Sequence, residues 1–265
     1  MRVNKHGLVL LLLAAAIPLS GCGFLTKLRA RDYLNKGVKA FVEQKYEEAT
    51  TLFQESIRLD PDFQVARMYL ATTYTSQFIP GSPDPKSLEM AQKAIATFKG
   101  ILDMDKVNVT QDTTINAMLS IASLYYQLQE YDESKKWCNN IQQVDPNNAE
   151  SLYRIAVIDY DDSLRNTGLQ GESVEFLSPE ERDRTLRNID EGLATIDKAL
   201  KIRRDYFDAM EYQNLLWREK AKFEKDPKAK AELIRQADLV ASKALAMRLK
   251  AEEEEAKKPK KLGSK

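Results

Sequence analysis

Few side chains in this sequence can do acid–base or nucleophilic chemistry. His6 is the only histidine, and the two cysteines are Cys22 and Cys138. Ser-His and Cys-His nucleophiles, histidine bases and most zinc or iron sites need an imidazole, which could come only from His6. The sequence therefore predicts no catalytic residue, no metal site and no cofactor.

Three neighbouring carboxylates are the exception. Asp159, Asp161 and Asp162 could hold a calcium ion or act as a pair of catalytic acids. The surrounding sequence lacks the glycine and the terminal glutamate of a calcium loop. A hydrolase also needs a defined separation between its two carboxyl groups, which spacing along the chain does not establish. A carboxylate-dependent hydrolase stays open as an alternative, and we expect a protein that is not an enzyme.

The amino terminus has the layout of a secretory signal. Arg2 and Lys5 form a basic start, residues 8–17 are apolar, and small residues follow. This apolar run is too short to cross about 30 Å of hydrocarbon as a helix. We expect residues 1–21 to be a signal peptide that is removed on export.

The end of this signal carries a further motif. Leu19-Ser20-Gly21-Cys22 resembles the lipobox of bacterial lipoproteins, which implies cleavage before Cys22 and acylation of that residue. Two or more acyl chains anchor a protein stably where one does not. Gly23, instead of aspartate, favours the outer membrane over the inner membrane. The alternative is an ordinary exported protein in which Cys22 is incidental.

Residues 115–146 read as two amphipathic helices. Apolar or small side chains recur at helical spacing in both halves, and Asp145-Pro146 ends the second helix because proline lacks the amide hydrogen. This pattern resembles the tetratricopeptide repeat, whose period is about 34 residues. The residues that carry the resemblance are Ala122, Tyr125, Ser134, Cys138 and Pro146.

Similar units recur along the chain. Gly37, Ala49 and Phe53 occupy the small and large positions of an earlier unit that ends at Asp60-Pro61. The resemblance implies an all-α, right-handed α-solenoid of about five helical hairpins over residues 30–250, with insertions in repeats 2, 4 and 5. We place two of these insertions at residues 76–86 and 161–178. Residues 22–29 would form a lipidated tether, and residues 251–265 a charged flexible tail.

The first helices of such an array line its concave side, which binds partners in this family. The family's contact positions fall on aliphatic, aromatic and hydroxyl side chains, which suit a peptide or an amphipathic helix. Equally, the same side chains could pack against neighbouring helices. The expected groove residues are Leu34, Phe41, Met68, Thr72, Leu119, Ser123, Tyr126, Tyr153 and Tyr160.

Charge does not identify a partner, because 40 basic and 40 acidic residues balance. This balance argues against nucleic acid. The resemblance to repeat lipoproteins of outer-membrane and pilus assembly implies a periplasm-facing scaffold that binds other proteins. A lipoprotein that binds cell wall or polysaccharide through paired tyrosines is the alternative.

Overall fold

The computed structural model describes residues 18–105 and 109–257, and it divides the chain into two compact units. Unit 1 extends to Leu128, and unit 2 starts at Gln129. The described residues form α-helices, turns and one short 3₁₀ helix, with no strand among them. The prediction of an all-α protein is confirmed.

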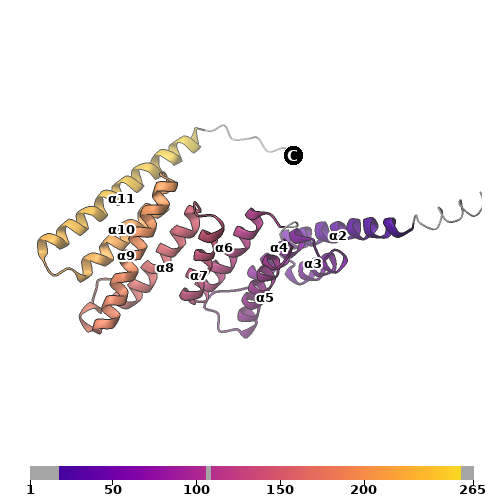
Figure 1. The fold of residues 1–265 in the computed structure, drawn as a ribbon, viewed down its shortest axis with the longest axis horizontal. Helices are drawn as coiled ribbons and strands as arrows, with labels where there is room; N and C mark the ends of the chain where they lie inside the picture. The colour runs from indigo at the N-terminus through magenta and orange to yellow at the C-terminus, as the bar shows by residue number, and fades with distance from the viewer. Residues whose placement is uncertain (1–17, 106–108, 258–265) are drawn as a thin grey trace, which may run out of the picture. The chain divides into compact units, whose positions relative to one another are not determined.

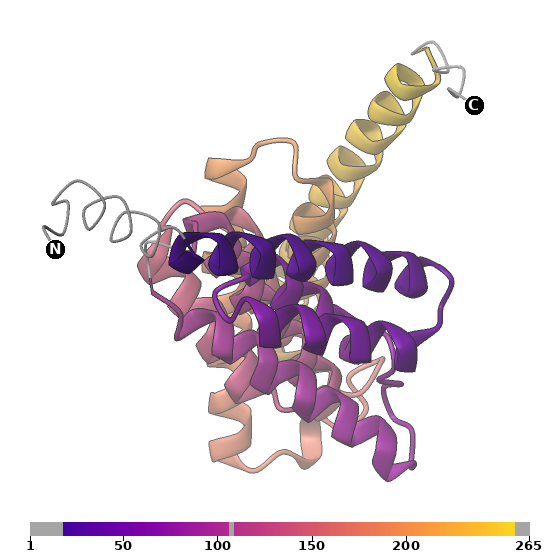
Figure 2. The same cartoon turned by 90° about the vertical axis from the view of Figure 1, so that its right-hand side faces the viewer.

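The described residues of unit 1 form five helices, and consecutive helices pack against one another (Figure 1). Figure 2 shows α2 and α3 lying side by side. The helices are α2 (Pro18–Val42), α3 (Tyr46–Leu59), α4 (Gln64–Thr75), α5 (Pro85–Leu102) and α6 (Gln111–Gln127).

Close approach of α2 and α3 depends on a glycine. A Cβ atom on Gly37 would lie 2.6 Å from Cε1 of Phe53, which is closer than two carbons can come without a shift. Phe53 and Ala49 are both fully buried, and α3 ends directly before Asp60-Pro61. The small and large positions predicted for this hairpin are therefore confirmed.

The predicted insertion between α4 and α5 is a loop tied to the start of α5. The buried Ser87 hydroxyl accepts from the Ile79 amide at 2.8 Å and donates to the Ile79 carbonyl at 3.0 Å. Asp84 caps α5 by accepting from the Lys86 amide at 2.9 Å. Phe78 is only 9% exposed. This loop is thus part of the packed structure of unit 1.

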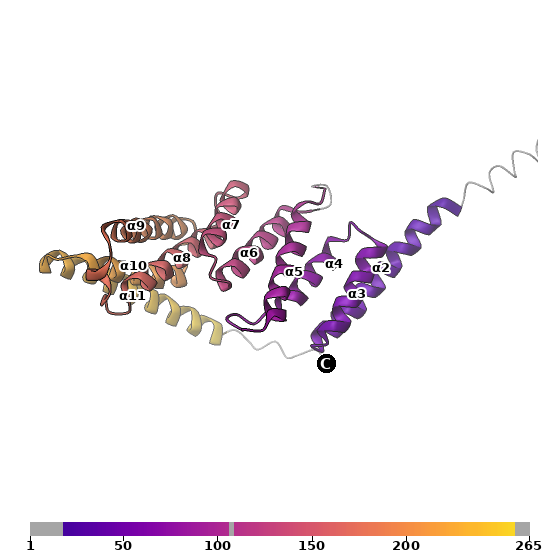
Figure 3. The same cartoon turned by 90° about the horizontal axis from the view of Figure 1, so that it is seen from below.

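The described part of unit 2 contains α-helices and one short 3₁₀ helix. Figure 3 shows α9 alongside α8 and α10, and all three pack together. The elements are α7 (Tyr131–Val144), α8 (Ala149–Thr167), the 3₁₀ helix η1 (Val174–Phe176), α9 (Pro179–Ile202), α10 (Phe207–Phe223) and α11 (Pro227–Ala256).

The insertion before α9 is shorter than predicted. We expected it to start at Asp161, but α8 continues to Thr167 and ends at Gly168, whose φ of 77° leaves helical geometry. Ser163 lies within this extension, where its buried hydroxyl donates to the Asp159 carbonyl at 2.7 Å. The predicted start of α9 at Ser178 is confirmed by a capping box with Glu181.

A buried ionic network holds the end of α8 against α10. The Glu219 carboxylate accepts from the Thr167 hydroxyl at 2.7 Å and from Lys222 at 2.5 Å. Lys222 also donates to the Gly168 carbonyl at 2.6 Å. A cation at this position satisfies a carbonyl at the helix end and opposes the negative end of the α8 dipole.

Two expected segments and one expected insertion differ in the structure. Residues 22–29, expected as a tether, lie within α2, and residues 251–256 of the expected tail lie within α11. We expected an insertion in repeat 5, but only residues 224–226 connect α10 and α11. The additional residues of this repeat therefore lie within its two helices. Residues 1–17 of the signal peptide and residues 258–265 of the tail lie outside the described part.

Candidate binding surfaces

Seven of the expected groove residues lie in unit 1. Leu34 and Phe41 are on α2, Met68 and Thr72 are on α4, and the other three are on α6: Leu119, Ser123 and Tyr126. Thr72 is exposed, whereas the other six are half-buried. Each therefore keeps part of its surface open within this unit.

Packing occupies part of the Phe41 ring. Its centroid lies 5.8 Å from that of Tyr46 and 6.4 Å from that of Tyr69, in tilted and edge-to-face geometry. Such pairs add about 0.5–1.5 kcal/mol beyond the area they bury. Phe41 thus contributes to the fold of unit 1 as well as to its surface.

The two expected groove residues of unit 2 lie on α8 and share one neighbour. Tyr153 and Tyr160 both meet the ring of Tyr212 on α10 edge-to-face, at centroid distances of 5.5 and 5.6 Å. Tyr153 also lies 5.0 Å from Tyr206. All three rings of this tyrosine cluster, Tyr153, Tyr160 and Tyr212, are half-buried.

Burial determines the charge state of this cluster. It raises the pKa of Tyr153 to about 12, and the neighbouring Tyr212, Asp208 and Glu150 act in the same direction. The pKa values of Tyr160 and Tyr212 are raised as well, again mainly by burial. The phenols therefore stay neutral and can donate hydrogen bonds. The sequence pattern did not indicate Tyr212, because its contact with α8 depends on how α10 packs.

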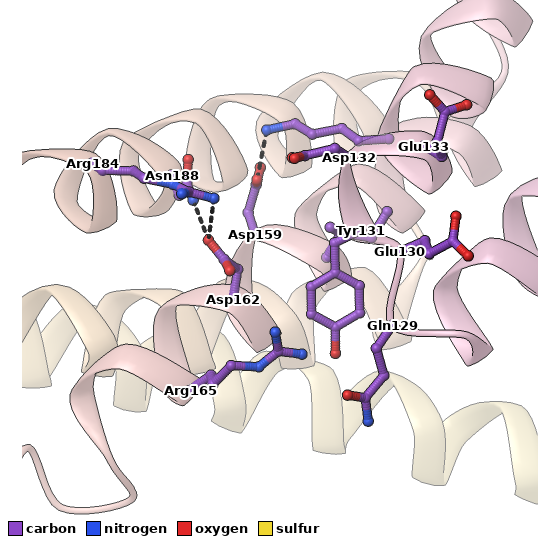
Figure 4. A pocket seen from close by; sticks show the side chains of 12 residues that line it. Gln129, Glu130, Tyr131, Asp132, Glu133, Asp159, Asp162, Arg165, Arg184 and Asn188 are labelled. Atoms are coloured by element: carbon purple, nitrogen blue, oxygen red, sulfur yellow. Dashed lines mark hydrogen bonds and ion pairs between the residues drawn. The ribbon is translucent and has the colours of Figure 1, made fainter. Parts of the chain in front are cut away.

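A polar pocket lies on another part of unit 2, with a volume of about 610 Å³ (Figure 4). Side chains from α7, α8, α9 and the turn before α7 line it. Its lining residues are Gln129, Glu130, Tyr131, Asp132, Glu133, Lys135, Ile158, Asp159, Asp162, Arg165, Arg184 and Asn188.

Two of the aspartates that line this pocket, Asp159 and Asp162, are already engaged. Lys135 donates to Asp159 at 2.7 Å and to Glu191 at 2.8 Å. Asn188 donates to Asp162 at 2.7 Å, and Arg184 lies 3.8 Å from the same carboxylate. Figure 4 shows Asp159 and Asp162 pointing to different partners.

Burial dominates the electrostatics of Asp159. Desolvation raises its pKa to about 7, although Lys135 favours the charged form. Burial by itself would lower the pKa of Lys135, but Asp159 and Glu191 keep that pKa raised. The second carboxylate oxygen of Asp159, Oδ2, is buried without a hydrogen-bond partner among the described residues. Asp159 is therefore a buried member of an ionic network.

The structure divides the predicted aspartate cluster. Asp159 and Asp162 line the pocket, whereas the charge of Asp161 acts on the tyrosine cluster, where it raises the pKa values of Tyr160 and Tyr212. Within the described ranges, no group of three or more histidine, cysteine, aspartate or glutamate side chains could hold a metal ion. The sequence alone did not indicate Lys135, Asn188 or Arg184 as the partners of these aspartates.

The structure describes the side chain of only one of the two cysteines, Cys138. Cys138 is fully buried on α7, and burial raises its pKa to about 12, which makes it a poor nucleophile at neutral pH. The side chain of Cys22, the expected lipidation site, lies outside the described residues. None of the helices in the described part is both long and apolar enough to cross a membrane.

Comparison with known proteins agrees with this geometry. Residues 115–148 match the family model of the tetratricopeptide repeat. A crystal structure of MamA superposes with a TM-score of 0.55 at 15% identity, covering 82% of this chain and 96% of that chain. MamA from Desulfovibrio magneticus RS-1 superposes with a TM-score of 0.54 at 12% identity, covering 84% and 96%. A search of curated proteins gives no match.

The chain contains a tetratricopeptide repeat, and its fold is that of tetratricopeptide-repeat proteins. This confirms the expected solenoid class. At these levels of identity the likeness extends to the fold alone.

Proposed function

We propose that this chain is a lipid-anchored, periplasm-facing lipoprotein, on the outer membrane, that acts as a protein–protein interaction scaffold in assembly of the cell envelope. The assembly would be of the outer-membrane or the pilus and secretion type. The scaffold acts by binding and not by catalysis. Its partners are proteins or peptides that contact the expected groove residues, and its anchor is the acylated Cys22.

The observation that carries the scaffold role is the half-open tyrosine cluster of unit 2. Tyr212 packs against both Tyr153 and Tyr160, Tyr206 packs against Tyr153 as well, and both rings remain half-buried. Rigid aromatic rings that are held at one edge lose little conformational entropy on binding, which suits them to a protein interface. The tetratricopeptide fold supports the same role.

The test uses two matched threonines of unit 1. Thr72 on α4 is an expected groove residue, and Thr51 on α3 is not. Both are exposed, and each hydroxyl donates to the carbonyl four residues earlier, at 2.9 Å for Thr72 and 3.1 Å for Thr51. An arginine at either position adds the same bulk and charge without removing a core contact.

Affinity capture from solubilised membranes compares these variants with the unaltered chain. We expect the unaltered chain and Thr51→Arg to capture the same envelope proteins, and Thr72→Arg to lose them. Circular dichroism checks that both variants fold. Equal capture by Thr72→Arg would contradict a binding role for the expected groove residues of unit 1. Mass spectrometry of the mature amino terminus tests the anchor, and a free amino group on Cys22 would contradict it.

The alternative of polysaccharide binding has one observation in its favour. The half-open rings of Tyr153 and Tyr160 could also stack on sugars. Sedimentation with isolated cell wall, with and without Tyr160→Ser, separates the two functions. Pelleting that depends on Tyr160, together with unchanged protein capture by Thr72→Arg, would favour the polysaccharide.

A further inference from the structure

The first described turns of α2 expose a cluster of apolar side chains. Phe24 is 66% exposed, Leu25 is 60% exposed and Leu28 is 43% exposed. Their spacing of one and three residues places them on one face of the helix. Three large apolar side chains grouped on one exposed face indicate a contact surface, whereas single exposed ones are ordinary.

Basic side chains flank this apolar face. Lys27, Arg29 and Arg31 are all exposed, and none of them forms an ion pair with another described residue. The nearest acidic residue along the chain, Asp32, pairs with Lys36 at 2.6 Å. Glu55, which pairs with Arg58, lies near enough to Arg29 to interact with its charge. With three cations and this one acidic neighbour, this end of α2 is both apolar and net positive.

The position of α2 keeps this face uncovered. The buried Ser56 hydroxyl donates to the Ala30 carbonyl at 2.7 Å, close to the end of α3 at Leu59. The residues of α2 before Ala30 therefore lie largely beyond the last turn of α3, and Figures 1 and 3 show α2 extending past it. We call residues 23–31 the basic apolar end of α2.

We propose that the basic apolar end of α2 lies on the surface of an anionic lipid bilayer. Phe24, Leu25 and Leu28 enter the boundary between headgroups and acyl chains, while Lys27, Arg29 and Arg31 contact lipid phosphates. Amphipathic helices with this distribution bind membranes through buried apolar area and attraction to anionic lipids.

This inference rests on the proposed function, since it takes Cys22 as the lipid-bearing residue. The basic apolar end starts at the next residue, so an acylated Cys22 would hold it at the bilayer. The same charges argue against a second copy of this chain as the occupant, because two such faces would repel each other. A lipid chain combined with a basic patch anchors a protein more firmly than either does alone.

The experiment uses the mature chain from residue 22 with Cys22→Ser, so that acylation cannot contribute. Sedimentation with vesicles of phosphatidylethanolamine and phosphatidylglycerol measures partition, and phosphatidylcholine vesicles give the uncharged reference. One variant combines Lys27→Gln, Arg29→Gln and Arg31→Gln, and another combines Phe24→Ser, Leu25→Ser and Leu28→Ser. Val42→Ser is the control, because Val42 is 73% exposed at the other end of the same helix.

We expect binding to the anionic vesicles, unchanged by Val42→Ser. Removing the three cations lowers the partition on the order of a hundredfold, because each contributes about a factor of five near an anionic surface. Removing the three apolar side chains lowers it about tenfold or more. The inference is overturned if the Cys22→Ser chain does not bind the anionic vesicles. It is also overturned if both triple variants bind as well as the Cys22→Ser chain without those substitutions.

Two further outcomes are distinguishable. Self-association that the apolar triple variant abolishes identifies a second copy as the occupant and overturns the inference. An acylated Cys22 in cells, together with no vesicle binding by the Cys22→Ser chain, removes only the role of α2 and leaves the proposed anchor intact.

Discussion

Units 1 and 2 bury different kinds of polar group. In the described part of unit 1 the buried polar side chains are the hydroxyl groups of Ser56, Thr73 and Ser87, and each donates to a backbone carbonyl. Unit 2 also buries two carboxylates, Asp159 and Glu219, each with a lysine against it.

This difference affects how each unit responds to its surroundings. A buried hydroxyl that donates to a carbonyl keeps its bond at any ordinary pH. A buried carboxylate is expensive to desolvate, and removing its partner leaves that cost uncompensated. We therefore expect unit 1 to depend on apolar packing, and unit 2 to depend also on its ionic networks.

Both tryptophans help to test this comparison, because Trp137 and Trp217 lie in unit 2. Tryptophan fluorescence therefore reports on unit 2, whereas far-UV circular dichroism reports on helices of both units. Together the two signals show which unit a substitution affects.

The largest effect is expected from the core of unit 1. Phe53→Ala removes a fully buried ring that fills the space left by Gly37, and we expect a loss of about 3–5 kcal/mol of unfolding free energy. Denaturant unfolding followed by circular dichroism measures it. Phe176→Ala is the control, because Phe176 is 87% exposed. Equal losses for the two variants would contradict the packing described for α2 and α3.

The second-largest effect is expected from the buried ion pair between Lys135 and Asp159 in unit 2. Lys135→Met leaves Asp159 buried without its cation, and we expect a loss of about 3 kcal/mol, measured by tryptophan fluorescence. Adding Asp159→Leu should restore most of it, since both charges are then gone. Lys136→Met is the matched control, because Lys136 pairs with Glu133 at the surface. A loss no greater than that of the control would show that the buried pair matters little.

A pH dependence separates the two units further. Folding raises the pKa of Asp159 from 3.8 to about 7, so the folded state favours the protonated carboxyl. Its stabilising contribution is complete below about pH 3.8 and is lost as the pH rises to about 7. Relative to Asp159→Asn, the unaltered chain should lose up to about 1.4 kcal/mol per pH unit in this window.

Tryptophan fluorescence at several pH values measures this difference. The charged groups that face Asp159 are Lys135, Glu191 and Asp162. The Lys135 pKa is raised from 10.5, so Lys135 stays charged throughout the window. A constant difference between the two proteins from pH 4 to pH 7 would contradict the raised pKa.

The smallest effect concerns a feature that the two units share. Gln44 before α3 and Gln129 before α7 both adopt a positive φ, of 59° and 61°. L-residues with side chains adopt this conformation at a cost that glycine avoids. Gln44→Gly and Gln129→Gly should each raise the free energy of unfolding by about 0.5–1 kcal/mol, measured by thermal unfolding. A lower free energy of unfolding would mean that the glutamine side chains make contacts that outweigh the cost of the positive φ.

Much of the fold was predictable from local pattern. The period of the apolar residues predicted helices, and Asp-Pro pairs predicted the ends of α3 and α7. The cap at Ser178 predicted the start of α9. These features depend on interactions within a few residues, so the sequence displays them directly.

The extent of α8 was not predictable in the same way. Asp161 and Asp162 read as the start of a loop, but α8 continues to Thr167, whose hydroxyl donates to Glu219 on α10. The candidate sites show the same limit. The sequence pattern indicated Tyr153, Tyr160 and Asp159, but it did not indicate their partners on other helices, Tyr212 and Lys135.

The sequence by itself determined the helical class of this protein, the repeat and the absence of any histidine after His6. Only the tertiary structure decided which side chains face one another. It set Asp159 and Asp162 in one pocket, brought the charge of Asp161 near enough to raise the pKa values of Tyr160 and Tyr212, and left Phe24, Leu25 and Leu28 exposed. The physical reason is that burial and pairing depend on residues distant along the chain, whereas helix formation depends mainly on near neighbours.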